Sequence, residues 1–158
     1  MKYTVRRKLE TYEIRDEEHH LAGRVRGSLC SGCRLSAEDA ESGICYEVTR
    51  EKGALVIQEA EGNPAYCKIR YLEDAAGYAR PPMALETELE AGDRTLMLRQ
   101  KKNRTFAILE NGRQLGEIRR MMSRNKELVL EEEDLKPYSG LLFAAAYLML
   151  HDDDVMVV

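Results

Sequence analysis

The sequence predicts a mainly β fold, in which repeated hairpins form an antiparallel sheet that closes or wraps around one helix. Short segments of alternating or clustered apolar residues recur between turn-like groups, and one hairpin pattern occurs three times along the chain. One further segment near the C-terminal end is apolar around its whole circumference. A helix of that kind has to be enclosed by the rest of the fold.

Length and composition set the first bounds on this fold. A chain of 158 residues suits one domain, expected to span residues 1–158, and is long enough to bury a sizeable core without disulfides or metals. The chain is 44% hydrophobic and 33% charged, with four Pro and 11 Gly. These values exclude a collagen-like chain and argue against wholesale disorder.

Four segments illustrate the strand pattern, each with apolar residues over four to seven positions: residues 12–15, 65–71, 95–99 and 127–130. The repeated hairpin covers residues 12–26, 55–70 and 106–119. In each copy a strand with a central Ile leads through a turn to a return strand with Val or Ile before Arg. Asn111-Gly112 in the third turn favours positive φ, as a tight hairpin requires. This spacing is typical of a β-meander.

The apolar helix is expected at about residues 137–151. At 1.5 Å per residue it is too short to cross the ~30 Å hydrocarbon core of a bilayer, so no transmembrane span is expected. Either Asp134 or Ser139 is placed to cap its N-terminus.

Taken together, the Tyr-x-Ile-x-Asp hairpin at residues 12–26, its echo at 106–119 and the apolar helix at 141–150 resemble the tubby C-terminal-like superfamily. That superfamily includes tubby domains, phospholipid scramblases and LURP-one-related proteins. The resemblance implies a closed barrel of about twelve antiparallel strands enclosing the C-terminal helix. Functions within the superfamily differ, since tubby domains bind membrane phosphoinositides through basic residues whereas scramblases act on lipids with calcium, and no family motif transfers residue by residue.

Charge is distributed unevenly along the chain. Residues 94–126 hold ten Lys and Arg against two acids, a net charge of +8 in a chain whose total is −4. Such asymmetry indicates either solvent faces paired with acidic strands or an anionic partner. For an anionic head group, the candidate ligand-binding residues are Arg99, Lys101, Arg119, Arg120 and Lys126.

Cys30-x-x-Cys33 is the one pair with metal-like or redox-like spacing. A structural zinc site commonly needs a second such pair, and a thioredoxin-like pair needs a βαβ setting. Neither is present, and His19, His20 and Cys45 are the nearest further ligands. We therefore expect no metal and no cofactor. A metal- or thiol-dependent protein that uses Cys30 and Cys33 remains the alternative function.

Several function classes are disfavoured by the sequence. No P-loop, dinucleotide fingerprint or nucleophile elbow occurs, and an acidic pI of 5.5 without Trp argues against nucleic-acid binding. The charged N-terminal residues lack signal-peptide features, which favours a cytoplasmic location, with the membrane surface as one place of action. The function expected is a non-enzymatic module that recognises anionic phospholipid or a protein partner.

Overall fold

The computed structural model describes residues 1–27, 34–51, 54–59, 64–72, 83–91, 93–101 and 104–150. Its elements, in chain order, are β1 (Lys2–Lys8), β2 (Thr11–Arg15), β3 (Leu21–Arg26), β4 (Arg34–Asp39), β5 (Cys45–Glu51), β6 (Ala54–Glu59), β7 (Pro64–Leu72), β8 (Met83–Ala91), β9 (Arg94–Gln100), β10 (Phe106–Glu110), β11 (Arg113–Arg119), β12 (Asn125–Leu130), the 3-10 helix η2 (Glu133–Tyr138) and α1 (Ser139–Leu150).

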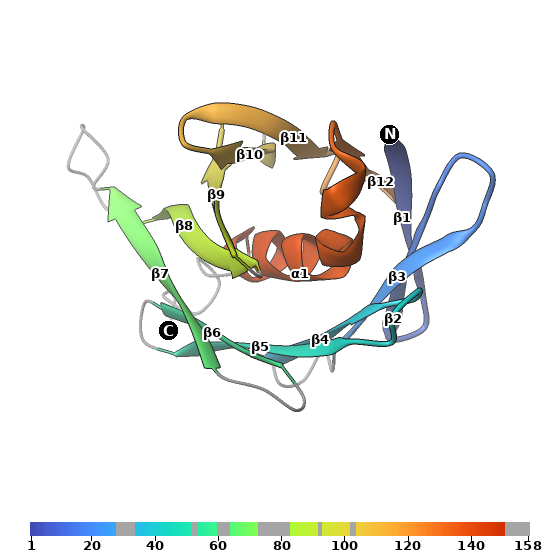
Figure 1. The fold of residues 1–158 in the computed structure, drawn as a ribbon, viewed down its shortest axis with the longest axis horizontal. Coiled ribbons are helices and arrows are strands. Elements are labelled where there is room, and N and C mark those ends of the chain that lie inside the picture. The colour runs from blue at the N-terminus through green and yellow to red at the C-terminus, as the bar shows by residue number, and fades with distance from the viewer. Residues whose placement is uncertain are drawn as a thin grey trace.

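Each strand pairs antiparallel with the next one along the chain, and β1 also pairs with β12, so that the order of pairing runs in a ring. Figure 1 shows these strands arranged around α1. The three predicted hairpins are confirmed as β2–β3, β6–β7 and β10–β11. The mainly β, antiparallel fold follows from the period-two apolar pattern that these strands share.

The prediction of a closed barrel of about twelve strands has to be corrected at β7. Residues 64–68 of β7 pair with β6, whereas residues 69–72 pair with β8, and no residue of β7 pairs with both neighbours. The two pairings of β7 thus occupy different parts of its length, and its ladder to β8 also contains a register shift between Arg70 and Tyr71. The strands therefore form one antiparallel sheet curled around the helix, without the continuous wall of a closed barrel.

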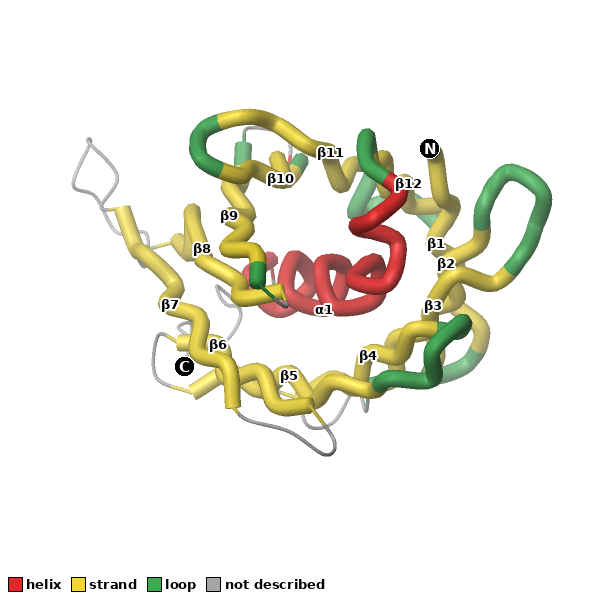
Figure 2. The backbone as a smooth tube through the Cα atoms, viewed as in Figure 1, coloured by secondary structure: helices red, strands yellow, loops and turns green. Residues whose placement is uncertain are grey.

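The predicted burial of the apolar helix is confirmed. All residues of α1 are buried except Tyr147 and Leu150, and the helix packs mainly against β3 and β4. Figure 2 shows it inside the curl of the sheet. The helix begins at Ser139 rather than near residue 137, because the preceding residues, including Pro137, form η2. Of the two predicted caps, Ser139 does not act through its side chain, since its buried hydroxyl has no hydrogen-bond partner among the described residues.

Candidate functional site

Of the five predicted ligand-binding residues, two lie at the end of β9. Arg99 points outward, because its neighbours Leu96 and Leu98 share the buried face of the strand. Its Nε donates to Glu86 Oε1 at 2.9 Å. Lys101, just after β9, donates to Gln114 Oε1 at 3.5 Å. The Arg99 charge thus already has a carboxylate partner on the neighbouring strand.

Two more of the predicted residues are bound to a single carboxylate. Arg119 lies directly opposite Glu127 in the β11–β12 ladder, and its Nε donates to Glu127 Oε2 at 2.6 Å. Arg120 reaches the other oxygen of Glu127 at 3.4 Å, and Lys2 lies 3.3 Å from it. The hydrogen bond from Arg119 lowers the pKa of Glu127 despite its partial burial, and Lys2 adds to this effect. These cations therefore belong to an ion-pair cluster on the outer face of the sheet.

Lys126 lies apart from the other four. It shares the inner side of β12 with the buried Leu128 and Leu130, because alternate residues of a strand face the same way. Its Nζ donates to the Ser123 carbonyl oxygen at 2.6 Å and lies 5.9 Å from the centre of the Tyr12 ring. Burial, and secondarily the charge of Arg7, lower the pKa of Lys126. Among the described residues, Lys126 takes no part in the ion pairs that hold Arg99, Arg119 and Arg120.

A second cation lies against the same aromatic ring. Arg7 is directly opposite Tyr12 in the β1–β2 ladder, and its guanidinium carbon lies 6.0 Å from the ring centre. Its Nε donates to the Leu9 carbonyl oxygen at 2.8 Å. Cation–π attraction at these distances adds a modest stabilisation to each cation. Two positive charges from different strands are thus gathered at one ring.

The Tyr12 ring is fixed in place by aromatic residues of α1. Its centre lies 5.1 Å from that of Phe143 and 5.6 Å from that of Tyr147, both in tilted arrangements. Burial, followed by the proximity of Tyr147, raises the pKa of Tyr12, while Arg7 acts in the opposite direction. The buried helix therefore positions the ring that both cations contact.

These residues line a surface pocket of about 400 Å³ at one end of the sheet, hereafter the basic pocket. Its lining consists of four cations, one aromatic ring, two apolar residues and a serine: Arg6, Arg7, Arg124, Lys126, Tyr12, Leu9, Met122 and Ser123. Within the described part of the chain, none of the four cations forms an ion pair. Glu13, which lies opposite Arg6, is instead paired with Lys8 and Arg15. The basic pocket is a concentration of uncompensated positive charge.

The sequence reasoning found Lys126 but missed its partners, because Arg7 and Tyr12 lie far outside residues 94–126. One feature of the sequence could have indicated Arg7. Along β1, Arg7 continues the alternation of the buried Tyr3 and Val5, which places an arginine on the apolar face of a strand. The pairing of β1 with β12 brings Arg7 near Lys126, and the sequence analysis named no strand at the position of β1.

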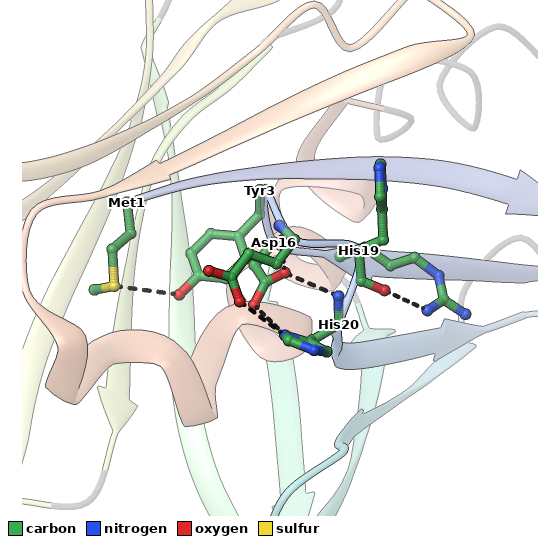
Figure 3. Close-up of polar contacts among 7 residues, drawn as sticks. Met1, Tyr3, Asp16, His19 and His20 are labelled. Atoms are coloured by element: carbon green, nitrogen blue, oxygen red, sulfur yellow. Dashed lines mark hydrogen bonds and ion pairs between the residues drawn. The ribbon is translucent and has the colours of Figure 1, made fainter.

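A polar cluster also occupies the β2–β3 turn (residues 16–20), at the opposite end of β2, as Figure 3 shows. Asp16 Oδ1 accepts hydrogen bonds from the backbone N–H groups of His20 at 2.8 Å and Glu18 at 2.9 Å. Burial raises the pKa of Asp16, but these hydrogen bonds lower it by more. Because the carboxylate is occupied by its own turn, it stabilises the hairpin and offers no evident ligand site.

Of the cysteines considered as metal or redox ligands, only Cys45 lies among the residues that the structure describes. Cys30 and Cys33 lie outside the described residues. Cys45 is a free thiol whose Sγ lies 3.1 Å from the Ser36 hydroxyl. Among the residues that the structure describes, no cluster of His, Cys, Asp or Glu has the arrangement of a metal site.

Comparisons of the chain with family models, with curated proteins and with solved structures find no match. Membership of the tubby-like superfamily accordingly stays a prediction. No helix in the described ranges has the length and apolarity needed to span a bilayer.

Proposed function

We propose that this protein is a non-enzymatic binding module that takes a phosphate-bearing anionic ligand in the basic pocket. The observation that carries the proposal is the pair of cations, Arg7 and Lys126, held at the Tyr12 ring with no carboxylate partner in the part of the chain that the structure describes. The proposed location is the cytoplasm, including the membrane surface, as expected from the sequence. The revised ligand set keeps Lys126 from the sequence prediction and adds Arg6, Arg7 and Arg124.

Electrostatics favour an anion at this place. Arg7 and Lys126 repel each other, and the lowered pKa of Lys126 reflects that repulsion together with burial. A bound anion would relieve the repulsion, and its attraction to the partly buried Lys126 would be stronger than the attraction to a fully hydrated lysine. Arg offers a planar fork that matches phosphate oxygens, while Lys acts as a compact point charge. A phosphate group therefore fits this donor set.

The other cations in the predicted set support the proposal less well. Arg99, Arg119 and Arg120 are engaged by Glu86 or Glu127, and an incoming anion would have to compete with these carboxylates. The alternative function rests on Cys30 and Cys33, which lie outside the described residues. The basic pocket consequently provides the stronger argument.

Calorimetric titration with soluble inositol trisphosphate tests the proposal. Arg7→Gln and Lys126→Met should each weaken binding about tenfold, the loss of roughly 1.4 kcal/mol expected for one charged hydrogen bond. Arg99→Gln is the matched control, because it removes an exposed arginine that is already paired, and it should bind like the wild type. Affinity should also fall as salt is raised, since mobile ions screen the attraction.

Two results would overturn the proposal. One is the absence of any binding by the wild-type protein. The other is binding that Arg99→Gln weakens as much as Lys126→Met does, since that would mark a diffuse response to total charge. Thermal melts of all variants confirm that each remains folded, so a lost affinity reports on the pocket.

A further inference from the structure

Two of the few exposed large apolar residues lie at the rim of the basic pocket. Leu9 is 92% exposed in the β1–β2 turn (residues 9–10), and Met122 is 68% exposed in the β11–β12 turn (residues 120–124). Because β1 pairs with β12, these turns project from the same end of the sheet, and both residues line the pocket. Because both side chains are largely exposed to water, they contribute little to the stability of the hydrophobic core.

Leu9 also has an unfavourable backbone conformation. Leu9 has a φ of +55°, a left-handed conformation that Gly or Asn adopts at lower cost than Leu. Since its side chain is almost fully exposed, packing within the described fold does not compensate for that strain. Strain retained at an exposed position is a reason to look for a role in binding.

Cations surround both apolar residues. Arg7 donates to the Leu9 carbonyl oxygen at 2.8 Å, and Arg104 NH1 lies 3.0 Å from the Met122 sulfur. Arg6, Arg124 and Lys126 complete the basic surroundings, while Glu10 is the one acid in these two turns. Protruding apolar side chains beside uncompensated positive charge match the two layers of an anionic bilayer surface, which are phosphate head groups and acyl chains.

We propose that this end of the sheet docks on an anionic membrane, with Leu9 and Met122 inserted at the boundary between head groups and acyl chains. This inference rests on the proposed function, because the same basic pocket would hold the lipid phosphate. It adds that the ligand is presented by a membrane and that the two turns supply apolar contact. A soluble phosphate compound would engage the cations but would leave both apolar side chains in water.

Vesicle sedimentation separates the two contributions. Wild-type protein should bind phosphatidylcholine vesicles that contain phosphatidylinositol bisphosphate at least tenfold more tightly than vesicles of phosphatidylcholine alone. Leu9→Asn and Met122→Ser should each weaken that binding about tenfold and should weaken the binding of soluble inositol trisphosphate much less, because they remove apolar contact from the rim of the pocket and no positive charge. Leu9→Asn should also melt no lower than the wild type, because Asn tolerates the left-handed backbone.

Ile44→Ser is the matched control. Ile44 is an exposed apolar residue, 40% accessible, in the β4–β5 turn (residues 40–44), which lies at the opposite end of the antiparallel sheet. Its replacement should leave vesicle binding unchanged.

A fluorescence measurement reports insertion directly, because the chain contains no Trp. The single tryptophan of Met122→Trp should shift its emission to the blue on addition of the anionic vesicles. The single tryptophan of Ile44→Trp should not shift.

The outcomes distinguish this inference from the proposed function. If soluble inositol trisphosphate binds through Arg7 and Lys126 but vesicle binding ignores both turn variants, or the Met122→Trp emission does not move, membrane docking is wrong and the phosphate pocket stands. If vesicles bind irrespective of Lys126→Met and of their charge, the phosphate pocket is wrong. Capture of a protein by the two turns, without vesicle binding, would also reject membrane docking.

Discussion

The Lys126 ammonium lies 5.9 Å from the centre of the Tyr12 ring, on the same side of the sheet as the hydrophobic core. A cation in that position is partly desolvated and faces the charge of Arg7, and both conditions lower its pKa. The arrangement opposes folding, because it places two like charges near one another and removes part of the hydration of Lys126. Under the proposed function, a ligand of opposite charge would offset this cost.

Lys126→Met should therefore raise the thermal midpoint at pH 7 or leave it unchanged, while it abolishes the charge needed for binding. Methionine keeps the unbranched shape of the lysine stem over Tyr12 without the desolvated charge. Differential scanning calorimetry without ligand measures the effect. Lys136→Met, in η2, is the control at another half-buried lysine. A clear fall in the midpoint of Lys126→Met alone would contradict this explanation.

Ala145→Asp should unfold the domain. Ala145 is fully buried in the middle of α1, surrounded by apolar residues that cannot hydrogen-bond a carboxylate. An unpaired buried charge costs several kcal/mol, which is comparable to the whole stability of a typical domain. Circular dichroism at 25 °C should show loss of the native spectrum. Asp134→Ala, at an exposed position of η2, should melt like the wild type; a soluble and folded Ala145→Asp protein would disprove the enclosed position of the helix.

The ion-pair cluster around Glu127 predicts a loss of stability in acid. The pKa of Glu127 is lowered in the folded protein, chiefly by Arg119. Its contribution is therefore fully present above the unfolded pKa of about 4.3 and is lost as the pH falls through the lower, folded pKa. Glu127→Gln should cost about 1 kcal/mol at pH 7 and should make the decline between about pH 5 and pH 3 shallower.

Urea unfolding across this pH range measures that difference. Glu131→Gln is the control, since Glu131 is exposed and forms no ion pair with any of the described residues. Equal acid sensitivity of Glu127→Gln and the wild-type protein would show that this carboxylate is not responsible for the decline.

Chelation should leave the fold intact. The sequence holds one close cysteine pair, Cys30 and Cys33, and no second one, whereas a structural zinc needs four well-placed ligands. Because structural zinc contributes directly to the free energy of folding, its removal would lower the thermal midpoint. We expect an unchanged midpoint with excess EDTA and no stoichiometric metal by elemental analysis. A bound metal that is lost together with the fold would support the alternative function.

The sequence by itself determined the local structure of this protein. Alternation along residues 95–99 correctly placed Leu96 and Leu98 inside and Arg99 outside, because side chains of a strand alternate between its faces whatever their partners are. The turn at Asn111-Gly112 adopts positive φ at both residues, as predicted from their conformational freedom. The apolar circumference of α1 required enclosure, and the helix is buried.

Only the tertiary structure decided which charges are available to a ligand. Strand alternation says that Arg99 and Arg119 face outward, but not that Glu86 and Glu127 neutralise them, since partners across a ladder depend on register. The interruption at β7 likewise depends on which of its residues pair with β6 and which pair with β8, and no local pattern encodes that division. The pairing of β1 with β12 joins residues more than a hundred positions apart. That contact, made by long-range folding rather than by local preference, brings Arg7 and Lys126 to the two sides of one pocket.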